Sequence, residues 1–434
     1  MLGFFIIFPV SHAFSEVNAP LTLDEAVNLA LEYNLSLRKA EIDLASSGLS
    51  ESNLWAEIFP SINASASAGY RNSLFSGAEI SGSGFNYSVG LGINLGLNAG
   101  IPYTMRSIRL AHASNLLRIE DARNQLSIQV TKYFFALVTE RNNLLLFEEV
   151  LNLAQRQLTR SETMFRNGLT GELSLTQSRL SLENARFNLS AARISHNNSM
   201  SEFLAMLGME SHDSLIDTTV DLSGEIRIVR IEANADELID RYLSHRPDII
   251  RSNQEIERLS LVQMQTFLQS RAPSINLSVD WSTSSFSPFT DLFSATARLS
   301  IPIDSWIPGT ARAMSASRSM DAVEKARLDL QITENSARAQ IRSLTSLLRG
   351  SWDSILIARL SLQAAQRGYQ LTETGFNNGT VEALVLHDAR NNMTNARQRL
   401  VQAELSYFNM ILDLSSALNM DWKELIETFG AQSE

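Results

Sequence analysis

Four stretches of the chain alternate apolar residues with small or polar ones, which is the pattern of a β-strand whose two faces differ. They cover residues 61–70, 86–97, 274–282 and 292–303. Their lengths of about 9 to 12 residues match what a tilted strand needs to cross a bilayer. Aromatic residues gather near the strand ends, as they do at membrane interfaces: Tyr70, Phe75, Phe85, Tyr87, Phe286, Phe289, Phe293 and Trp306.

The alternation by itself fits either a membrane-crossing sheet or a soluble sandwich, because the strands of a sandwich alternate in the same way. Their number decides between them. Four strands leave two open edges, and hydrocarbon offers no water to unpaired backbone groups. We therefore expect three copies to close one twelve-stranded barrel. In that barrel, lipid would contact Val89, Leu91, Ile93, Leu277, Val279 and Leu299.

Two much longer stretches step their apolar residues by four and three, which predicts helices with a coiled-coil seam. They cover 103–166 and 310–375, and each is followed by a returning helix, at 172–208 and at 383–419. A helix of about sixty residues runs about 90 Å, several times the width of a small domain. One core cannot bury such helices. We therefore expect the two antiparallel hairpins to pack beside those of other copies into a tubular α-barrel.

The chain is an internal duplication, because its motifs recur in the same order. Ile58–Asn63 matches Arg271–Asn276, and Phe165–Gly168 matches Phe376–Gly379. The first repeat covers 21–210 and the second covers 235–420, with a linker at 211–234 and a C-terminal segment at 421–434. The predicted fold class is mainly helical, with four membrane-crossing strands in each chain.

A short turn closes each hairpin. Gly168 and Gly379 suit the left-handed residue at the end of a helix. The hydroxyls of Thr170 and Thr380 are expected to cap the helix that follows. Turns of this kind are common, so their sequence alone does not assign them a binding role.

Composition narrows the class of protein further. The chain has 434 residues and no cysteine, which excludes thiol catalysis, disulfides and thiolate metal sites and suits an oxidising compartment. It has only 20 glycines and 9 prolines, where average usage gives about 30 and about 22. The net charge of -11 opposes nucleic-acid binding, whose affinity comes from clustered lysine and arginine.

The N-terminus predicts export. Residues 1–13 hold an apolar run, Leu2–Val10, followed by Ser11, His12 and Ala13, and small residues at this spacing suit cleavage of a secretory signal. The run is short and no basic residue precedes it. A hydrophobic N-terminus that is not a signal is the alternative.

No constellation of residues predicts chemistry. Gly90–Gly96 lacks the spacing of a dinucleotide loop, and no helix opens from it. His387 and Asp388 stand together without the further ligands that a metal site requires. No nucleophile, base and orienting group form a recognisable set. We expect neither an enzyme nor a cofactor, and without a Walker loop any active transport draws its energy from partner proteins.

The order of short helix, helix, two strands, long helix, turn and helix, present twice, resembles the TolC-type outer membrane efflux proteins. The matching residues are Leu21–Ala26 with Asn34, Arg246–Ile249, Pro60–Ile62, Pro273–Ile275 and the Gly168 and Gly379 turns. The resemblance implies a passive homotrimeric duct in the outer membrane that extends into the periplasm. Such a duct works with a periplasmic adaptor and an inner-membrane transporter, in efflux or type I secretion. The alternative is a soluble periplasmic coiled-coil spacer or adaptor.

The resemblance also implies a tip where the tunnel narrows and the adaptor docks. The docking turns would be Gly168, Leu169, Thr170, Gly171, Gly379, Thr380 and Val381. Asp388 takes the position of an acidic residue that faces the tunnel entrance, and Gln177 is its counterpart in the first repeat. A threefold ring of carboxylates there would attract cations, although aspartates that are merely solvated are as common. Val385, Val381 and Phe376 depart from the polar residues that the family places nearby.

Overall fold

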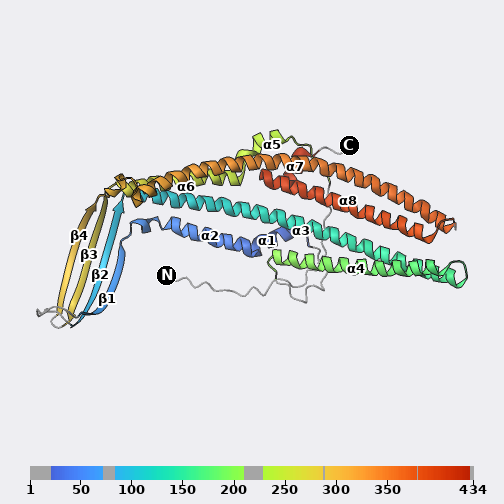
Figure 1. Cartoon of the computed structure of the whole chain (residues 1–434), viewed down its shortest axis with the longest axis horizontal. Coiled ribbons are helices and arrows are strands. Elements are labelled where there is room, and N and C mark those ends of the chain that lie inside the picture. The colour runs from blue at the N-terminus through green and yellow to red at the C-terminus, as the bar shows by residue number, and fades with distance from the viewer. Residues whose placement is uncertain (1–20, 72–83, 210–227, 287–288, 379, 431–434) are drawn as a thin grey trace. The chain divides into compact units, whose positions relative to one another are not determined.

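The computed structural model describes residues 21–71, 84–209, 228–286, 289–378 and 380–430 (Figure 1). The expected signal at 1–13, Phe75, Gly379 and most of the 211–234 linker lie outside these residues. The chain divides into two compact units. The first holds residues 1–39, 121–246 and 337–434, and the second holds 40–120 and 247–336.

The second unit carries a four-stranded antiparallel sheet in the order β1-β2-β3-β4. The strands are β1 (Ser61–Arg71), β2 (Gly84–Asn98), β3 (Ser274–Phe286) and β4 (Phe289–Ser300). β3 extends beyond residue 282, where the predicted strand ends. β4 stops at Ser300 rather than at 303, because Pro302 has no N–H to donate to a neighbouring strand.

Helices lead into this sheet and out of it at one end. α2 (Leu35–Ser52) and the short η1 (Leu54–Ile58) precede β1, and α6 (Pro247–Arg271) precedes β3. The short η3 (Asp304–Trp306) follows β4. Because the strands are antiparallel, β1 and β3 begin at the end where β2 and β4 finish. All four connections to the helices therefore lie at the same end of the sheet.

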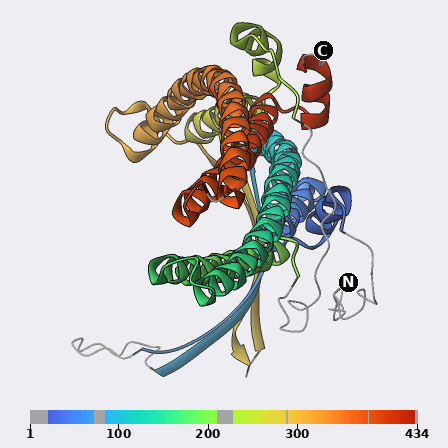
Figure 2. The same ribbon diagram turned by 90° about the vertical axis from the view of Figure 1, so that its right-hand side faces the viewer.

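The first unit is built from two helical hairpins. α3 (Ile101–Arg166) lies beside α4 (Glu172–Met206), and α7 (Ala311–Asn377) lies beside α8 (Ala383–Leu418), as Figure 2 shows in a view from the end of the hairpins. The N-terminal parts of α3 and α7 belong to the second unit. The first unit also contains α1 (Leu23–Tyr33), α5 (Ala235–Tyr242), η2 (Leu243–His245) and α9 (Trp422–Phe429). The predicted fold class, with paired antiparallel helices and four strands, is confirmed.

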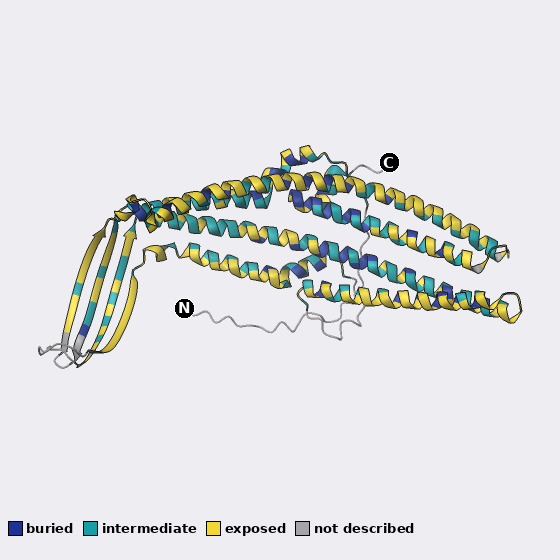
Figure 3. Ribbon diagram, viewed as in Figure 1, coloured by how far each residue is buried: buried dark blue, intermediate teal, exposed yellow. Residues whose placement is uncertain are grey.

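Each hairpin buries a narrow line of side chains. Ala154, Leu182 and Ala185 form a buried cluster between α3 and α4. Away from such lines, exposed residues predominate along the helices of the single chain (Figure 3). A narrow seam is what a four-and-three spacing produces. It leaves large apolar side chains, such as Leu180 and Phe187, in contact with solvent.

Aromatic residues are the largest fully buried side chains of the first unit. Phe134 and Tyr407 are fully buried. Phe408 meets Phe135 edge to face, with 4.8 Å between the ring centroids, and meets Trp422 at 5.4 Å. These contacts join α3, α8 and α9. The C-terminal segment, for which the sequence predicted no element, therefore forms a helix that belongs to this core.

The two repeats share long-range hydrogen bonds at matching positions. Asn34 Nδ2 donates to the carbonyl oxygen of Met206 over 2.8 Å. Arg246 holds the matching place in the second repeat, and its Nη1 donates to the carbonyl oxygen of Ala417 over 2.9 Å. In each case a side chain ahead of a helix satisfies a carbonyl at the end of the returning helix.

The returning helices also end alike. Gly208 after α4 and Asn419 after α8 both have a positive φ, 78° and 53°. Glycine and asparagine are the residues that adopt this left-handed conformation most readily. At Gly208 a side chain is excluded for a second reason, because a Cβ there would lie 2.3 Å from the carbonyl oxygen of Tyr33. The duplication therefore extends to backbone conformation.

Tyr407 offers a test of the aromatic core. Its hydroxyl donates to the carbonyl oxygen of Val229 over 3.0 Å and accepts from the N–H of Ile231 over 2.9 Å. Tyr407→Phe removes the partner of the buried Ile231 N–H and of the half-buried Val229 carbonyl, so we expect the free energy of unfolding to fall by about 1 to 3 kcal/mol. Urea denaturation in detergent, followed by circular dichroism, measures the change.

Tyr369→Phe is the matched control, since it removes a single hydroxyl bond to the partly exposed Glu373. Its loss of stability should be clearly smaller. Equal losses for the two variants would contradict the role given to Tyr407.

Candidate functional site

The pairing register gathers the alternating apolar residues on one face of the sheet. Ala64, Leu91, Trp281 and Phe293 lie opposite one another across the four strands, and so do Ile62, Ile93, Val279 and Ala295. Leu91 is 52% exposed and Val279 is 38% exposed. A sheet of a soluble protein buries such a face against a second layer. Here large apolar residues stay uncovered along it, which is the property of an interaction surface.

The opposite face is lined by small and polar residues. Asn63, Gly92, Asp280 and Ser294 lie opposite one another. Glycine at position 92 makes room for the carboxylate, because a Cβ there would lie 2.8 Å from Asp280 Oδ1. Across these rows of paired residues the two faces therefore differ in chemistry, and a slip of one residue would exchange them.

Both edges of the sheet are open. Within the described residues β1 pairs only with β2, and β4 pairs only with β3. Among the residues that the structure describes, the outer backbone groups of β1 and β4 thus have no partner strand. The apolar face and the two open edges together define the first functional region of the protein.

The second region is the pair of turns that close the hairpins. Gly168 has a φ of 69°, and the N–H of Leu169 donates to the carbonyl oxygen of Met164 over 2.9 Å. In the second hairpin, the N–H of Thr380 donates to the carbonyl oxygen of Gly375 over the same distance. The described parts of the two turns therefore carry the same helix-ending hydrogen bond.

The predicted capping by threonine is wrong. The N-cap of α4 is Gly171, which has no side chain, and the N-cap of α8 is Glu382, which makes no side-chain capping bond. Thr380 Oγ1 instead donates backward to the carbonyl oxygen of Gly375 over 3.0 Å. Thr170 and Thr380 precede the N-cap position by one and two residues, because each tight turn uses those residues to end the first helix.

The structure places the two candidate gate residues in different surroundings. Asp388 is exposed on α8, whereas Gln177 is half-buried on α4. Gln177 lines a cavity of about 20 Å³ together with Gln157, Ser178, Ser181, Leu384 and His387. A cavity of this size holds about one water molecule. Positions 177 and 388 match in the two repeats, but their side chains therefore lie in different environments.

A buried arginine beside this cavity joins the two hairpins. Arg390 of α8 is 4% exposed, and it donates to Ser181 Oγ of α4 over 3.0 Å and to Gln157 Oε1 of α3 over 3.3 Å. His387 Nδ1 lies 3.1 Å from Ser181 Oγ and 3.1 Å from Arg390 Nη2. We call these four residues the Arg390 cluster. Sequence reasoning missed it: the repeat match of Arg179 with Arg390 was visible, but Arg179 is exposed.

Burial, and then the charge of Arg390, hold the pKa of His387 below its usual value, while Asp388 acts in the opposite direction. The neutral ring accepts a hydrogen bond from Arg390 at Nδ1. A protonated ring loses this acceptor and places a second positive charge beside a buried guanidinium. Closer to the turns, the Arg160 guanidinium lies 5.1 Å from the centre of the Phe376 ring.

Two negative findings apply to the described part of the chain. None of its helices is both long and apolar enough to cross a membrane. In the same residues, no group of three or more histidine, aspartate or glutamate side chains is placed to hold a metal ion.

The chain belongs to the outer membrane efflux protein family, whose model matches residues 26–209 and 238–420. Its fold is similar to that of the CmeC outer membrane channel of Campylobacter jejuni, with 18% identity, a TM-score of 0.74 and coverage of 94% of this chain and 88% of that one. VceC of Vibrio cholerae gives 16% identity, a TM-score of 0.71 and coverage of 92% and 96%. MtrE of Neisseria gonorrhoeae, in its open state, gives 19% identity, a TM-score of 0.69 and coverage of 92% of this chain and 89% of that one. Among curated proteins, none matches.

The family and the fold together make the protein an outer membrane efflux channel of the TolC type, which spans the outer membrane and extends into the periplasm. It is a transport channel and not an enzyme. The alternative of a soluble periplasmic spacer is set aside, because both repeats match the channel family.

The Arg390 cluster predicts a dependence on pH. Since the folded state holds the pKa of His387 low, the unfolded chain binds a proton that the folded chain does not. The contact between α4 and α8 should therefore be fully stable above about pH 6.5, the usual pKa of histidine, and should weaken as the pH falls below it. Hydrogen exchange of the segment 383–391 at pH 7.5 and pH 5.5, corrected for intrinsic rates, measures this change.

His387→Gln is the control, because it removes the group that titrates. Its corrected exchange should differ little between the two pH values. If the unmodified protein gives the same protection at both pH values, the cluster does not respond to protonation of His387.

Proposed function

We propose that three copies of the chain build the channel, and that their sheets close one twelve-stranded barrel around a water-filled lumen. The observation that carries the proposal is the pair of open edges, β1 and β4, beside a continuous apolar face. TolC-like channels are trimeric. Two copies would give about eight strands, whose interior is largely filled by side chains, whereas three leave an aqueous passage.

The two faces of the sheet fit this arrangement. Lipid would contact the apolar face at Val89, Leu91, Ile93, Leu277, Val279 and Leu299. The small and polar residues of the other face would line the lumen. Glycine at positions 90 and 92 keeps the lumen side of β2 free of bulk.

The helices support the same assembly. α4 exposes Leu180 and Phe187, and α7 exposes Leu347, Leu360 and Leu371. Their burial against the hairpins of neighbouring copies would remove this surface from water at about 25 cal/mol per Å². The assembled hairpins then form a periplasmic tunnel that continues the barrel.

The turns are the proposed tip of the tunnel. Leu169 is 70% exposed, and at Gly168 and Gly171 a Cβ would meet nothing within 4 Å. A periplasmic adaptor can therefore approach the backbone closely at Gly168, Leu169, Thr170 and Gly171. By the repeat match, Gly379, Thr380 and Val381 are the proposed docking residues of the second turn. The adaptor links the channel to an inner-membrane transporter, which supplies the energy. Asp388, exposed after the second turn, contributes one carboxylate per copy to a ring at the entrance.

The assignment of the sheet faces is tested by introducing charge. Leu91→Arg and Leu277→Arg place a cation in hydrocarbon, so each should cost about 2 to 4 kcal/mol of folding free energy if the site lies near the bilayer midplane. Urea-dependent folding into vesicles measures this cost. Ser88→Arg and Ser278→Arg are matched controls on the lumen face and should be tolerated better. Equal effects on both faces would reject the assignment.

The channel itself is tested by conductance. The purified protein in a planar bilayer should form aqueous pores that prefer cations. Asp388→Ala should keep the pore but move the reversal potential in a salt gradient toward zero, because the carboxylates that attract cations are gone. Asp353→Ala, which removes an exposed acid from the middle of α7, is the control. Absence of pores would overturn the proposed duct, and unchanged selectivity in Asp388→Ala would overturn the gate assignment.

A further inference from the structure

Arg271 has no anionic partner among the residues that the structure describes. It ends α6, and its guanidinium carbon lies 4.6 Å from the centre of the Phe267 ring and 4.8 Å from the centre of the Trp306 ring. Its Nε atom is buried and has no hydrogen-bond partner. Within the described residues its only contacts of a polar kind are these two rings. Aromatic rings attract a guanidinium but accept none of its N–H groups as a carboxylate or phosphate does.

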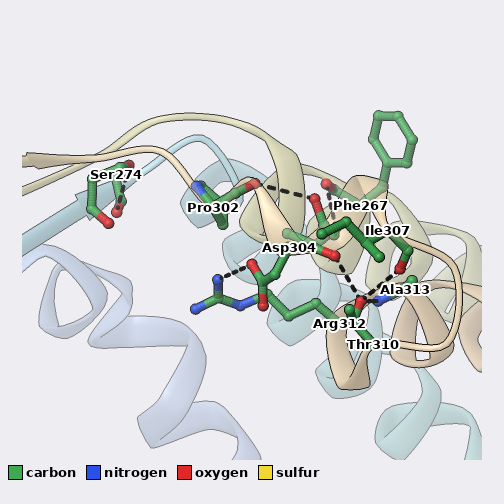
Figure 4. Close-up of polar contacts among 11 residues, drawn as sticks. Phe267, Ser274, Pro302, Asp304, Ile307, Thr310, Arg312 and Ala313 are labelled. Atoms are coloured by element: carbon green, nitrogen blue, oxygen red, sulfur yellow. Dashed lines mark hydrogen bonds and ion pairs between the residues drawn. The ribbon is translucent and has the colours of Figure 1, made fainter.

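The frame around Arg271 is rigid. Thr310 Oγ1 donates to the carbonyl oxygen of Asp304 over 2.7 Å, and Ser305 Oγ donates to that of Pro302 over 3.2 Å (Figure 4). These bonds brace η3, the short helix that ends with Trp306. Arg312 Nη1 meets Asp304 Oδ1 at 2.7 Å, so the one carboxylate of η3 is already taken by another arginine (Figure 4).

The surroundings of Arg271 are apolar and uncovered. Ile303 is 72% exposed, Trp306 is 64% exposed and Ile307 is 56% exposed. They follow directly on β4, whose apolar face ends with Leu299. At the same end of the sheet, the exposed rings of Trp55 and Phe59 meet edge to face at 5.0 Å. Exposed tryptophan beside aliphatic residues is typical of the boundary between hydrocarbon and headgroups.

We infer that Arg271 binds the phosphate of a phospholipid in the periplasmic leaflet of the outer membrane. The inference rests on the proposed function, which puts the helix-bearing end of the sheet on the periplasmic side. The planar guanidinium suits bidentate contact with phosphate oxygens. Ile303, Trp306 and Ile307 supply apolar surface for the acyl chains, which free phosphate lacks. The first repeat has Ile58 at the matching position, so each chain carries one such site.

The test counts lipids on the full chain. Protein purified in detergent is titrated with dioleoylphosphatidylglycerol, and native mass spectrometry gives the affinity for the lipids bound first. Arg271→Gln should weaken that affinity about tenfold, the effect of losing a charge-assisted hydrogen-bonded pair. Arg312→Gln, at a cation already paired with Asp304, should keep it within about twofold. Arg271→Lys keeps the positive charge but loses the planar guanidinium that can make two parallel hydrogen bonds. Its lipid affinity should therefore lie between those of Arg271→Gln and Arg312→Gln.

Unchanged affinity in Arg271→Gln overturns the inference, and so does displacement of the lipid by inorganic phosphate at equal concentration. If Arg271→Gln does not fold, the lipid affinity of Arg271→Lys is compared with that of the unmodified protein instead.

A separate measurement tests the proposed membrane position of the strands independently of the Arg271 site. In a variant that retains Trp281 as its one tryptophan, lipids brominated deep in the acyl chains should quench the fluorescence. Loss of that quenching contradicts the membrane position of the strands, whereas its presence with unchanged lipid affinity contradicts only the Arg271 site.

Discussion

Everything in this protein follows from the requirement that backbone hydrogen bonds be satisfied where water is absent. The four-stranded sheet satisfies its inner ladders, and in the described part of the chain the outer groups of β1 and β4 pair with no further strand. In water those groups would be solvated, but beside an apolar face in a membrane they would not be. In the proposed trimer, pairing between the sheets of identical copies would leave no strand edge open.

The helices are subject to a similar constraint, which concerns the burial of apolar side chains and not the pairing of backbone groups. A seam spaced by four and three residues buries one narrow line per hairpin, as Ala154, Leu182 and Ala185 show. The remaining apolar residues of α4 and α7 stay exposed in the single chain. Both helices thus carry apolar surface outside the seam of their hairpin, which the proposed assembly would bury against neighbouring copies.

The two repeats agree in backbone conformation and differ in their side-chain contacts. Positions that need a special backbone conformation match between the repeats, as the left-handed residues Gly208 and Asn419 do. Other positions do not agree: Arg390 is buried between the hairpins, while Arg179 is exposed. Arg271 meets two aromatic rings where the first repeat has Ile58. Backbone geometry restricts the frame to few residue types, whereas side chains at the same place in the other repeat meet different neighbours and are free to diverge.

The sequence by itself determined the strands, the long helices, the duplication and the two unlike faces of the sheet, because each of these is a periodic pattern local to the chain. It also located the ends of α3 and α7, since the long helical periods stop there. Tertiary structure alone decided what lies between elements. Threonine capping was predicted wrongly, and the Arg390 cluster was not foreseen. Both depend on which residues hundreds of positions apart come within about 3 Å, or on how a tight turn ends, and no local period encodes such contacts.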